Sequence, residues 1–556
     1  MSDDRQDLRV KAAASISLSL KPILGADGTV ISHVHVAMRI RGLELTPGEA
    51  LIQMPLLFDN FETTARSIAD LEVTDSGGSV PVLARDHEST GSANRTWIAT
   101  RPVSGEVSIH YSIAVHAISH SLGAAPPLEL RSEGCSFSGG GVSLIALPAS
   151  LQLFEVDVNW NLTGLPPGAK GITTFGEGRA CSQTPISLAQ LKETYFMAGA
   201  VGHYSDGAGF FGAWQGTPPY DAKALLHWSN QLYDGYKEFF GVRSTRTLGV
   251  FLRRNPVNAG GGREGYRSFV VTYGHGMGNN AQSMRFVISH EMFHTFSPML
   301  NRPRSAAENF RLVDRWFSEG LAVFYAGLLP LRLGLIGDAE YVNDLNFYAG
   351  RYYTSDMMRV PNADLPLRYW ADTRVRTLAY DRGMLYFASV DCEVRRTTGN
   401  RYSLDDIVRE LRAREEDGRT IDNGDWEEQV RLHLGAPGIE QFRAFLAGTP
   451  PLPASEAFGA RFRRVSRPLR RYELGFDPQV LAEKRRVVRG IVAGSEAQRA
   501  GLSNGDRIVE PVPQDLIQGT QDMRIHLRVE RGHEQISISY LPRGGFVDAY
   551  QWELIA

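Results

Sequence analysis

Cysteine is scarce in this chain of 556 residues, which contains only three, at positions 135, 181 and 392. They have no CxxC spacing, and an odd, sparse set argues against both a disulfide framework and a thiolate metal site. Long apolar runs are lacking too, because no stretch reaches the length of about 18 residues that suggests a membrane-spanning helix. Any metal must therefore be held by histidines and carboxylates, and we expect no membrane span.

Excess charge of either sign is also missing. The formal net charge is −3 and the isoelectric point is about 6.6, so no positive field exists to recruit nucleic acid. The first residues, MSDDRQDLRVKAAASISLSL, are acidic before they are apolar and lack the apolar segment of a signal peptide. We therefore expect a cytoplasmic protein, or a periplasmic one if a signal peptide has been removed.

Three sections follow one another along the chain, which is too long for one ordinary core. Residues 1–165 alternate apolar and polar side chains between turn residues, and this predicts an antiparallel, sandwich-like β domain. Residues 166–455 become mainly helical in their periodicity. A proline-rich linker at 448–459 precedes a β-rich module at 465–556. The prediction is a multidomain α+β protein.

The segment SHEMFHTFSP, residues 289–298, contains a pattern that is typical of zinc-binding sites. His290 and His294 are four residues apart, so on a helix both imidazoles leave the same face and can reach one Zn²⁺ at about 2.0–2.1 Å. Glu291 follows the first histidine and can point at the position where water binds. The alternative is a helix whose histidines are buried or exposed without a metal.

Catalytic zinc usually has three protein ligands, and Glu319 in DRWFSEGLAVFYAG is the best third candidate. It lies in a second apolar helical run, where a carboxylate is costly to bury unless a cation neutralises it. Glu308 and Asp314 are rival ligands in more polar surroundings. The sequence thus predicts one Zn²⁺ per chain, held by His290, His294 and Glu319.

Together, SHEMFHTFSP, RWFSEGLAVFY and YDRGMLYFASVDCEVRRTTGNRYSLDDIVREL resemble the glycyl aminopeptidase family of zinc metallopeptidases. The resemblance covers most of the chain. It implies a thermolysin-like catalytic domain, with a β domain in front and a PDZ module behind. It also implies that His290, His294 and Glu319 bind zinc, that Glu291 is the general base and acid, and that the Tyr380 hydroxyl helps to hold the oxyanion.

One family feature looks altered. Related aminopeptidases carry a G-A-M-E-N or G-G-L-E-H loop before the zinc helix, whose glutamate pairs with the free α-amino group of the substrate. In YGHGMGNN, residues 273–280, the substrate-binding loop is expected at Gly276, Met277, Gly278 and Asn279, with Gly278 in place of the glutamate. This predicts altered recognition of the amino terminus, unless the loop lies elsewhere or another acid substitutes.

The C-terminal section resembles a bacterial PDZ domain. Leu474, Gly475 and Phe476 match the loop whose N–H groups bind a peptide carboxylate, and GSEAQRAGLSNGDRI follows in the right order. The C-terminal end of a peptide is the ligand expected there. The alternative is a β module that only packs on the peptidase.

The sequence therefore favours a zinc-dependent metallopeptidase that acts on peptides or proteins and is related to aminopeptidases. Three alternatives remain: an endopeptidase with the same zinc chemistry, a PDZ-type peptide-binding protein with a vestigial metal site, and hydrolysis of a non-peptide amide. Retention of both histidines, Glu291 and Glu319 favours the enzyme.

Overall fold

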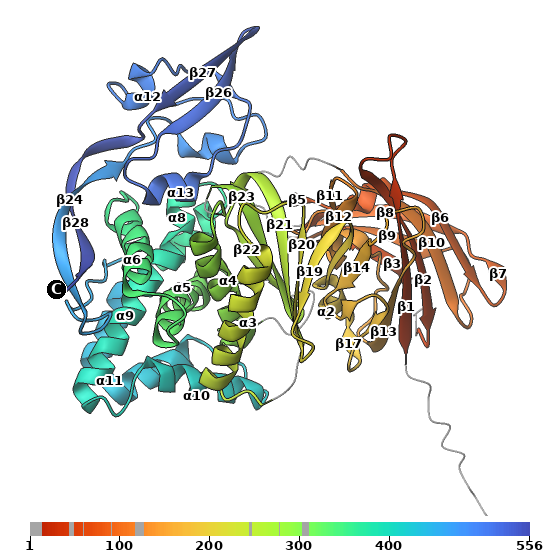
Figure 1. Ribbon diagram of the computed structural model, residues 1–556, viewed down its shortest axis with the longest axis horizontal. Helices are drawn as coiled ribbons and strands as arrows, with labels where there is room; N and C mark the ends of the chain where they lie inside the picture. Colours follow the sequence, from red (N-terminus) through yellow and green to blue (C-terminus); the bar gives the residue numbers. More distant parts are fainter. Residues whose placement is uncertain are drawn as a thin grey trace, which may run out of the picture.

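The computed structural model describes residues 14–43, 49–58, 61–89, 92–116, 127–243, 247–276, 278–302 and 311–555. Its elements form three groups (Figure 1): N-terminal β-sheets, a central group of helices with one sheet, and a small β module above the helices. Among the described residues, no helix combines the length and apolar character that crossing a membrane requires.

The N-terminal sheets arise from strict alternation of apolar and polar residues; in β1, for example, Ile16, Leu18 and Leu20 are buried. The largest sheet has the order β16 (Ala180–Cys181), β13 (Leu153–Trp160), β1 (Ser15–Leu24), β2 (Ile31–Arg41), β10 (Val107–Ala114), β6 (Ile68–Asp75) and β7 (Gly78–Ser79), with β17 (Ile186–Ser187) paired to β13. A three-stranded sheet has the order β3 (Ala50–Pro55), β9 (Ser92–Ala99) and β8 (Val82–Ser89), and β4 (Leu57–Phe58) pairs with β5 (Phe61–Glu62).

A further sheet follows, with the order β11 (Arg131–Glu133), β12 (Ser136–Gly140), β18 (Tyr195–Gly199), β14 (Lys170–Thr173) and β15 (Gly176–Glu177). The short helices α1 (Gly141–Leu144) and α2 (Leu188–Lys192) lie within this part of the chain. Phe196 and Ala198 of β18 belong to the same apolar core as the largest sheet, so this core extends beyond residue 165, the predicted end of the N-terminal domain.

The central group contains one mixed sheet and a layer of helices. The sheet order is β19 (Val201–Ser205), β20 (Phe210–Gln215), β21 (Leu248–Ala259), β23 (Ser268–Gly276) and β22 (Gly262–Gly265), which places the short, antiparallel β22 at an edge. The helices are α3 (Ala222–Phe239), α4 (Ala281–Phe296), α5 (Arg315–Arg332), α6 (Asp338–Tyr353), α7 (Leu365–Arg368), α8 (Thr373–Arg376), α9 (Leu378–Thr398), α10 (Leu404–Glu416) and α11 (Asn423–Leu446).

Two glycines allow α5 and α9 to pack closely. A Cβ added to Gly320 would lie 2.6 Å from the Cα of Gly383, which is too close for any side chain. Glu319 precedes Gly320, and Tyr380 lies one turn before Gly383 on α9. The close contact therefore fixes the relative position of the helices that carry these two side chains.

The C-terminal module has its own apolar core within residues 472–540. It contains β25 (Arg507–Ile508), β26 (Ile525–Arg531), β27 (Glu534–Tyr540), α12 (Glu496–Arg499) and α13 (Gln514–Gly519). The strands β24 (Phe462–Tyr472) and β28 (Arg543–Leu554) form a two-stranded ribbon beside α6 (Figure 1). There Asn346 donates to the carbonyl of Trp552 and accepts from its N–H, each at 2.7 Å.

Candidate active site

Helix α4 presents the two histidines and the glutamate of SHEMFHTFSP. Asn280 caps the helix by accepting a hydrogen bond from the Ser283 N–H at 2.9 Å. Most of the helix is buried against α3, α5 and β22, and both histidines and Glu291 are buried with it. A buried helix of this kind holds side chains in fixed directions, which a metal site requires.

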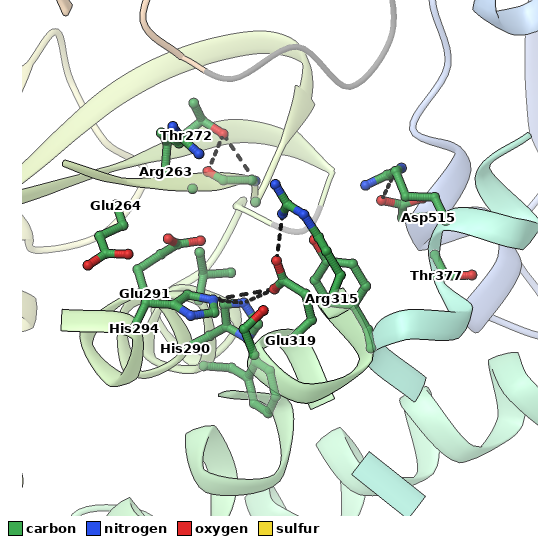
Figure 2. A pocket seen from close by; sticks show the side chains of 18 of the residues that line it. Arg263, Glu264, Thr272, His290, Glu291, His294, Arg315, Glu319, Thr377 and Asp515 are labelled. Atoms are coloured by element: carbon green, nitrogen blue, oxygen red, sulfur yellow. Dashed lines mark hydrogen bonds and ion pairs between the residues drawn. The ribbon is translucent and has the colours of Figure 1, made fainter. Parts of the chain in front are cut away.

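His290, His294 and Glu319 converge from α4 and α5, as Figure 2 shows. The two Nε2 atoms are 3.2 Å apart, and Glu319 Oε2 lies 3.2 Å from that of His290 and 3.3 Å from that of His294. Ligands at about 2.0–2.1 Å in a tetrahedral zinc site stand about 3.3–3.4 Å from one another. The three atoms thus have the spacing of a zinc site.

The carboxylate of Glu319 faces the imidazoles with one oxygen only. Its other oxygen, Oε1, accepts a hydrogen bond from Arg315 Nη1 at 2.7 Å, one helical turn earlier. Burial opposes ionisation of Glu319, but the two imidazoles and Arg315 outweigh it and hold its pKa well below the ordinary value. Glu319 is therefore a ready anionic ligand.

The rival ligands do not join this group. Asp314 accepts a hydrogen bond from Asn301 Nδ2 at 2.8 Å and pairs with Arg311, although it lines the same cavity. Glu308 lies outside the described residues. Within the described part of the chain, His290, His294 and Glu319 form the one cluster with the spacing of a metal site.

A cavity of about 260 Å³ opens onto these side chains. Glu291 lines it next to β22: a Cβ added to Gly262 would lie 2.4 Å from Glu291 Oε1. Burial raises the pKa of Glu291 to about 7, and the nearby carboxylates of Glu319 and Glu264 act in the same direction against the attraction of His290. A cation at the histidines would favour its ionised form.

Strand β22 brings a second carboxylate to the cavity. Side chains two residues apart on a strand share a face, so Glu264 lies on the side of Gly262 that faces Glu291, and Figure 2 shows both carboxylates beside His294. Burial raises the pKa of Glu264, partly offset by Arg302 and His294. The sequence prediction did not include this residue.

Tyr380 lies in the first turn of α9 and also lines the cavity. Its ring stacks near His290, with centroids 5.9 Å apart and planes 19° apart. Burial, together with the negative charge of Glu319, raises the pKa of Tyr380 well above its ordinary value. The phenol therefore keeps its proton and remains a hydrogen-bond donor at neutral pH.

The loop expected to bind the amino terminus does not line this cavity at its described residues. Gly276 ends β23, and Gly278 accepts a hydrogen bond from the Gly274 N–H at 3.0 Å. A Cβ added to Gly278 would lie 2.6 Å from the Thr272 carbonyl oxygen, so no side chain fits there. Asn279 is exposed at the turn before α4, and Met277 lies outside the described residues.

The proposed peptide-carboxylate loop of the C-terminal module is packed inward. Leu474 and Phe476 are buried in its core, and the Leu474 carbonyl accepts a hydrogen bond from the Tyr540 hydroxyl at 2.7 Å. The Gly475 carbonyl accepts one from the Val492 N–H at 2.9 Å. Residues 473–506 are all described and contain no strand that follows the loop. Peptide capture there stays a prediction.

The chain resembles a known family in one segment and a solved structure in its fold. Residues 283–374 match the family model of the M61 glycyl aminopeptidase. An aminopeptidase N family protein from Idiomarina loihiensis has a similar structure, with a TM-score of 0.68, 15% identity, and coverage of 97% of this chain and 98% of that one. A variant of an M1 zinc metallopeptidase from Deinococcus radiodurans, bound to a Tyr-Ser-Ala substrate, has a TM-score of 0.46, 15% identity, and coverage of 80% and 97%. No curated protein sequence matches the chain.

The HExxH helix, the second helix with its glutamate and the matched segment define the class of the protein, a zinc metallopeptidase. The matched segment, residues 283–374, belongs to the model of the family that the sequence motifs resemble, the glycyl aminopeptidases. The predicted order of a β-sheet domain followed by a mainly helical domain is confirmed.

Proposed function

We propose that the protein is a zinc-dependent aminopeptidase that removes residues from the free amino terminus of peptides. The observation that carries this proposal is the position of Glu264, whose carboxylate lines the cavity beside Glu291 and the His290–His294–Glu319 cluster. A second carboxylate in the same cavity as the cluster suits the positive charge of a substrate α-amino group.

The residues of the chain then have distinct tasks. A zinc ion held by His290, His294 and Glu319 would polarise the scissile carbonyl and make water a better nucleophile. Glu291 accepts the proton of the attacking water and delivers it to the leaving amine. Tyr380, protonated and beside His290, donates a hydrogen bond to the carbonyl oxygen as negative charge develops on it.

Glu264 removes the reason to expect altered recognition of the amino terminus. Gly261, Gly262, Arg263 and Glu264 reproduce the order of glycines and glutamate in the family's G-G-L-E-H loop better than residues 276–279 do. Gly262 allows Glu291 to approach, and Glu264 supplies the charge. We therefore place the amino-terminal subsite at β22 and favour the exopeptidase over the endopeptidase alternative.

Metal dependence is tested on the purified full chain. We expect one zinc per chain by elemental analysis, loss of peptide hydrolysis on treatment with a chelator, and recovery on addition of Zn²⁺. Full activity in the chelated protein would contradict the proposal.

End recognition is tested with peptides that differ only in acetylation of the amino terminus. We expect hydrolysis of the free peptides alone, and a loss of about 2–5 kcal/mol in transition-state binding in Glu264→Gln, because the ammonium would lose its charged partner. Glu177→Gln, on β15, is the matched control and should behave like the wild type. Equal hydrolysis of free and acetylated peptides would favour the endopeptidase instead.

A further inference from the structure

The C-terminal module is in contact with the catalytic cavity through α13. Asp515 and Leu516 line the cavity together with the residues of the metal site. Gly519, at the end of α13, lies so close to α6 that an added Cβ would be 2.2 Å from the ring of Phe347. Since such a contact admits no side chain, α13 is fitted closely onto the catalytic helices.

Asp515 binds the segment that leads to Tyr380. Its Oδ2 accepts a hydrogen bond from Arg376 Nη2 at 2.6 Å, and its Oδ1 accepts one from the Thr373 hydroxyl. Arg376 also donates to the Thr373 hydroxyl at 3.1 Å. Thr373 and Arg376 are the ends of α8, and only Thr377 separates α8 from α9. A carboxylate of the C-terminal module therefore fixes the start of the helix that carries Tyr380.

A second ion pair, between Arg351 and Asp381, holds the same segment. Arg351 of α6 donates to both oxygens of Asp381, at 2.6 and 2.8 Å, and Asp381 follows Tyr380. Burial opposes ionisation of Asp515, but Arg376 and Arg351 outweigh it, and its pKa lies below the ordinary value. Asp515 thus remains an anion beside Arg376 and Arg351, and Arg351 pairs with the residue that follows Tyr380.

The cavity has two ends with respect to the cluster. In Figure 2, Glu264 and Asp515 lie on opposite sides of His290, His294 and Glu319. A peptide with its amino group at Glu264 and its first peptide bond at the cluster must extend its following residues away from Glu264. That direction leads to Asp515 and Leu516.

We propose that the C-terminal module forms the wall against which the residue after the scissile bond packs, so that Leu516 is a specificity-determining residue. Asp515 is a positioning residue, which acts through Arg376 on the start of α9. This inference rests on the proposed aminopeptidase function, because that function orients the peptide in the cavity.

The role of Leu516 is tested with peptides of one amino-terminal residue and a varied second residue, from alanine to tryptophan. Leu516→Ala removes part of the wall and enlarges the space for the second residue. The kcat/KM for tryptophan relative to alanine at that position should therefore rise by about tenfold, within the range that one pocket contact supplies. The ratio between different amino-terminal residues should not change, since that subsite lies at β22. Unchanged ratios at the second residue would overturn the assignment.

The role of Asp515 is tested by a double-mutant cycle with Arg376. Asp515→Asn and Arg376→Gln should each lower kcat by about tenfold, with a smaller effect on KM, and the double variant should lose no more than either single one. Glu530→Gln, which removes the ion pair with Arg507 elsewhere in the module, is the matched control and should keep wild-type kcat. Additive losses, or equal losses in the control, would exclude the positioning role.

Peptide binding to Glu291→Gln, measured by calorimetry, separates this inference from the proposed function. If peptides bind and the wild type cleaves them, but Leu516→Ala alters no preference for the second residue, the wall is misplaced and the aminopeptidase stands. If the zinc-loaded chain neither binds nor cleaves peptides, both are wrong. A changed preference in binding and cleavage alike supports both.

Discussion

Arg315 donates from Nη1 to Glu319 Oε1 at 2.7 Å, while Glu319 Oε2 lies within 3.3 Å of the Nε2 atoms of His290 and His294. The two oxygens of one carboxylate thus have separate partners. Arg315 keeps the carboxylate turned so that a single oxygen completes the triangle with the imidazoles. Arg315, which is not a member of the cluster, therefore sets the orientation of one of its side chains.

Substitution of Arg315 by methionine should weaken zinc binding. The methionine retains apolar bulk but leaves Glu319 Oε1 without this donor, so the carboxylate can rotate or bind a proton. Loss of a partner of this kind lowers metal affinity by about 10–100-fold. Competition with a chromophoric chelator measures the dissociation constant.

The control for this experiment is Arg285→Met. Arg285 lies on α4 and donates to both oxygens of Glu340 on α6, at 2.9 and 2.6 Å, so its loss also breaks a paired arginine near the site. Its zinc affinity should equal that of the wild type. The same loss in both variants would show that Arg315 acts only through general stability.

Substitution of Glu291 by glutamine should retain zinc and abolish turnover. Glutamine keeps the shape of the side chain next to Gly262, but it cannot accept the proton of the attacking water. General base and acid catalysis contributes about 10²–10⁴-fold each time it is used, so we expect a loss of kcat in this range or beyond. Zinc content and kcat are measured on the same preparation; turnover near the wild-type value would assign the proton transfer to another group.

The helix positions of the metal ligands follow from local sequence, and for this reason they could be predicted. His290 and His294 share a face because a helix turns about once in 3.6 residues. Glu319 stood out because a carboxylate amid Trp316, Phe317 and Leu321 requires a compensating charge. Both arguments need only a short window of residues, and the structure brings all three side chains together.

Glu264 and Asp515 could not be found in the same way. Glu264 reaches the cavity because β22 folds back along the edge of β23 in one register, with Gly262 opposite Val271, and this register depends on the whole sheet. Asp515 meets Arg376, which is 139 residues away in the chain. The first position depends on the register of a sheet and the second on the docking of the C-terminal module, and periodicity within a segment predicts neither.

An added methyl group at Gly262 should lower the activity and leave the zinc content unchanged. The Cβ of Gly262→Ala would lie 2.4 Å from Glu291 Oε1, so either β22 or the glutamate must move. Overpacking of this kind costs about 1–3 kcal/mol, and we expect activity to fall by about tenfold or more. Steady-state kinetics and zinc analysis check this.

Gly261→Ala provides the matched control on the neighbouring residue. A Cβ there would meet only the Thr272 hydroxyl oxygen, at 4.0 Å, which is an ordinary van der Waals contact. Its activity should remain within about twofold of the wild type, since substitutions away from contacts usually change the free energy by less than about 0.5 kcal/mol. Equal losses in both variants would attribute the effect to stiffening of the loop.

Acid should release the contact between Asp515 and the arginines. The pKa of Asp515 is lowered in the folded chain by Arg376 and Arg351, so its ionised form stabilises the fold above the ordinary aspartate pKa of about 3.9. This stabilisation is fully present at neutral pH and is lost as the pH falls through the lowered pKa. The urea midpoint of the wild type should therefore exceed that of Asp515→Asn at neutral pH, and the margin should shrink below about pH 4. Comparison with the variant removes the effect of acid on the groups that both proteins share; a margin that grows on acidification would show that Asp515 is better bound as the neutral acid.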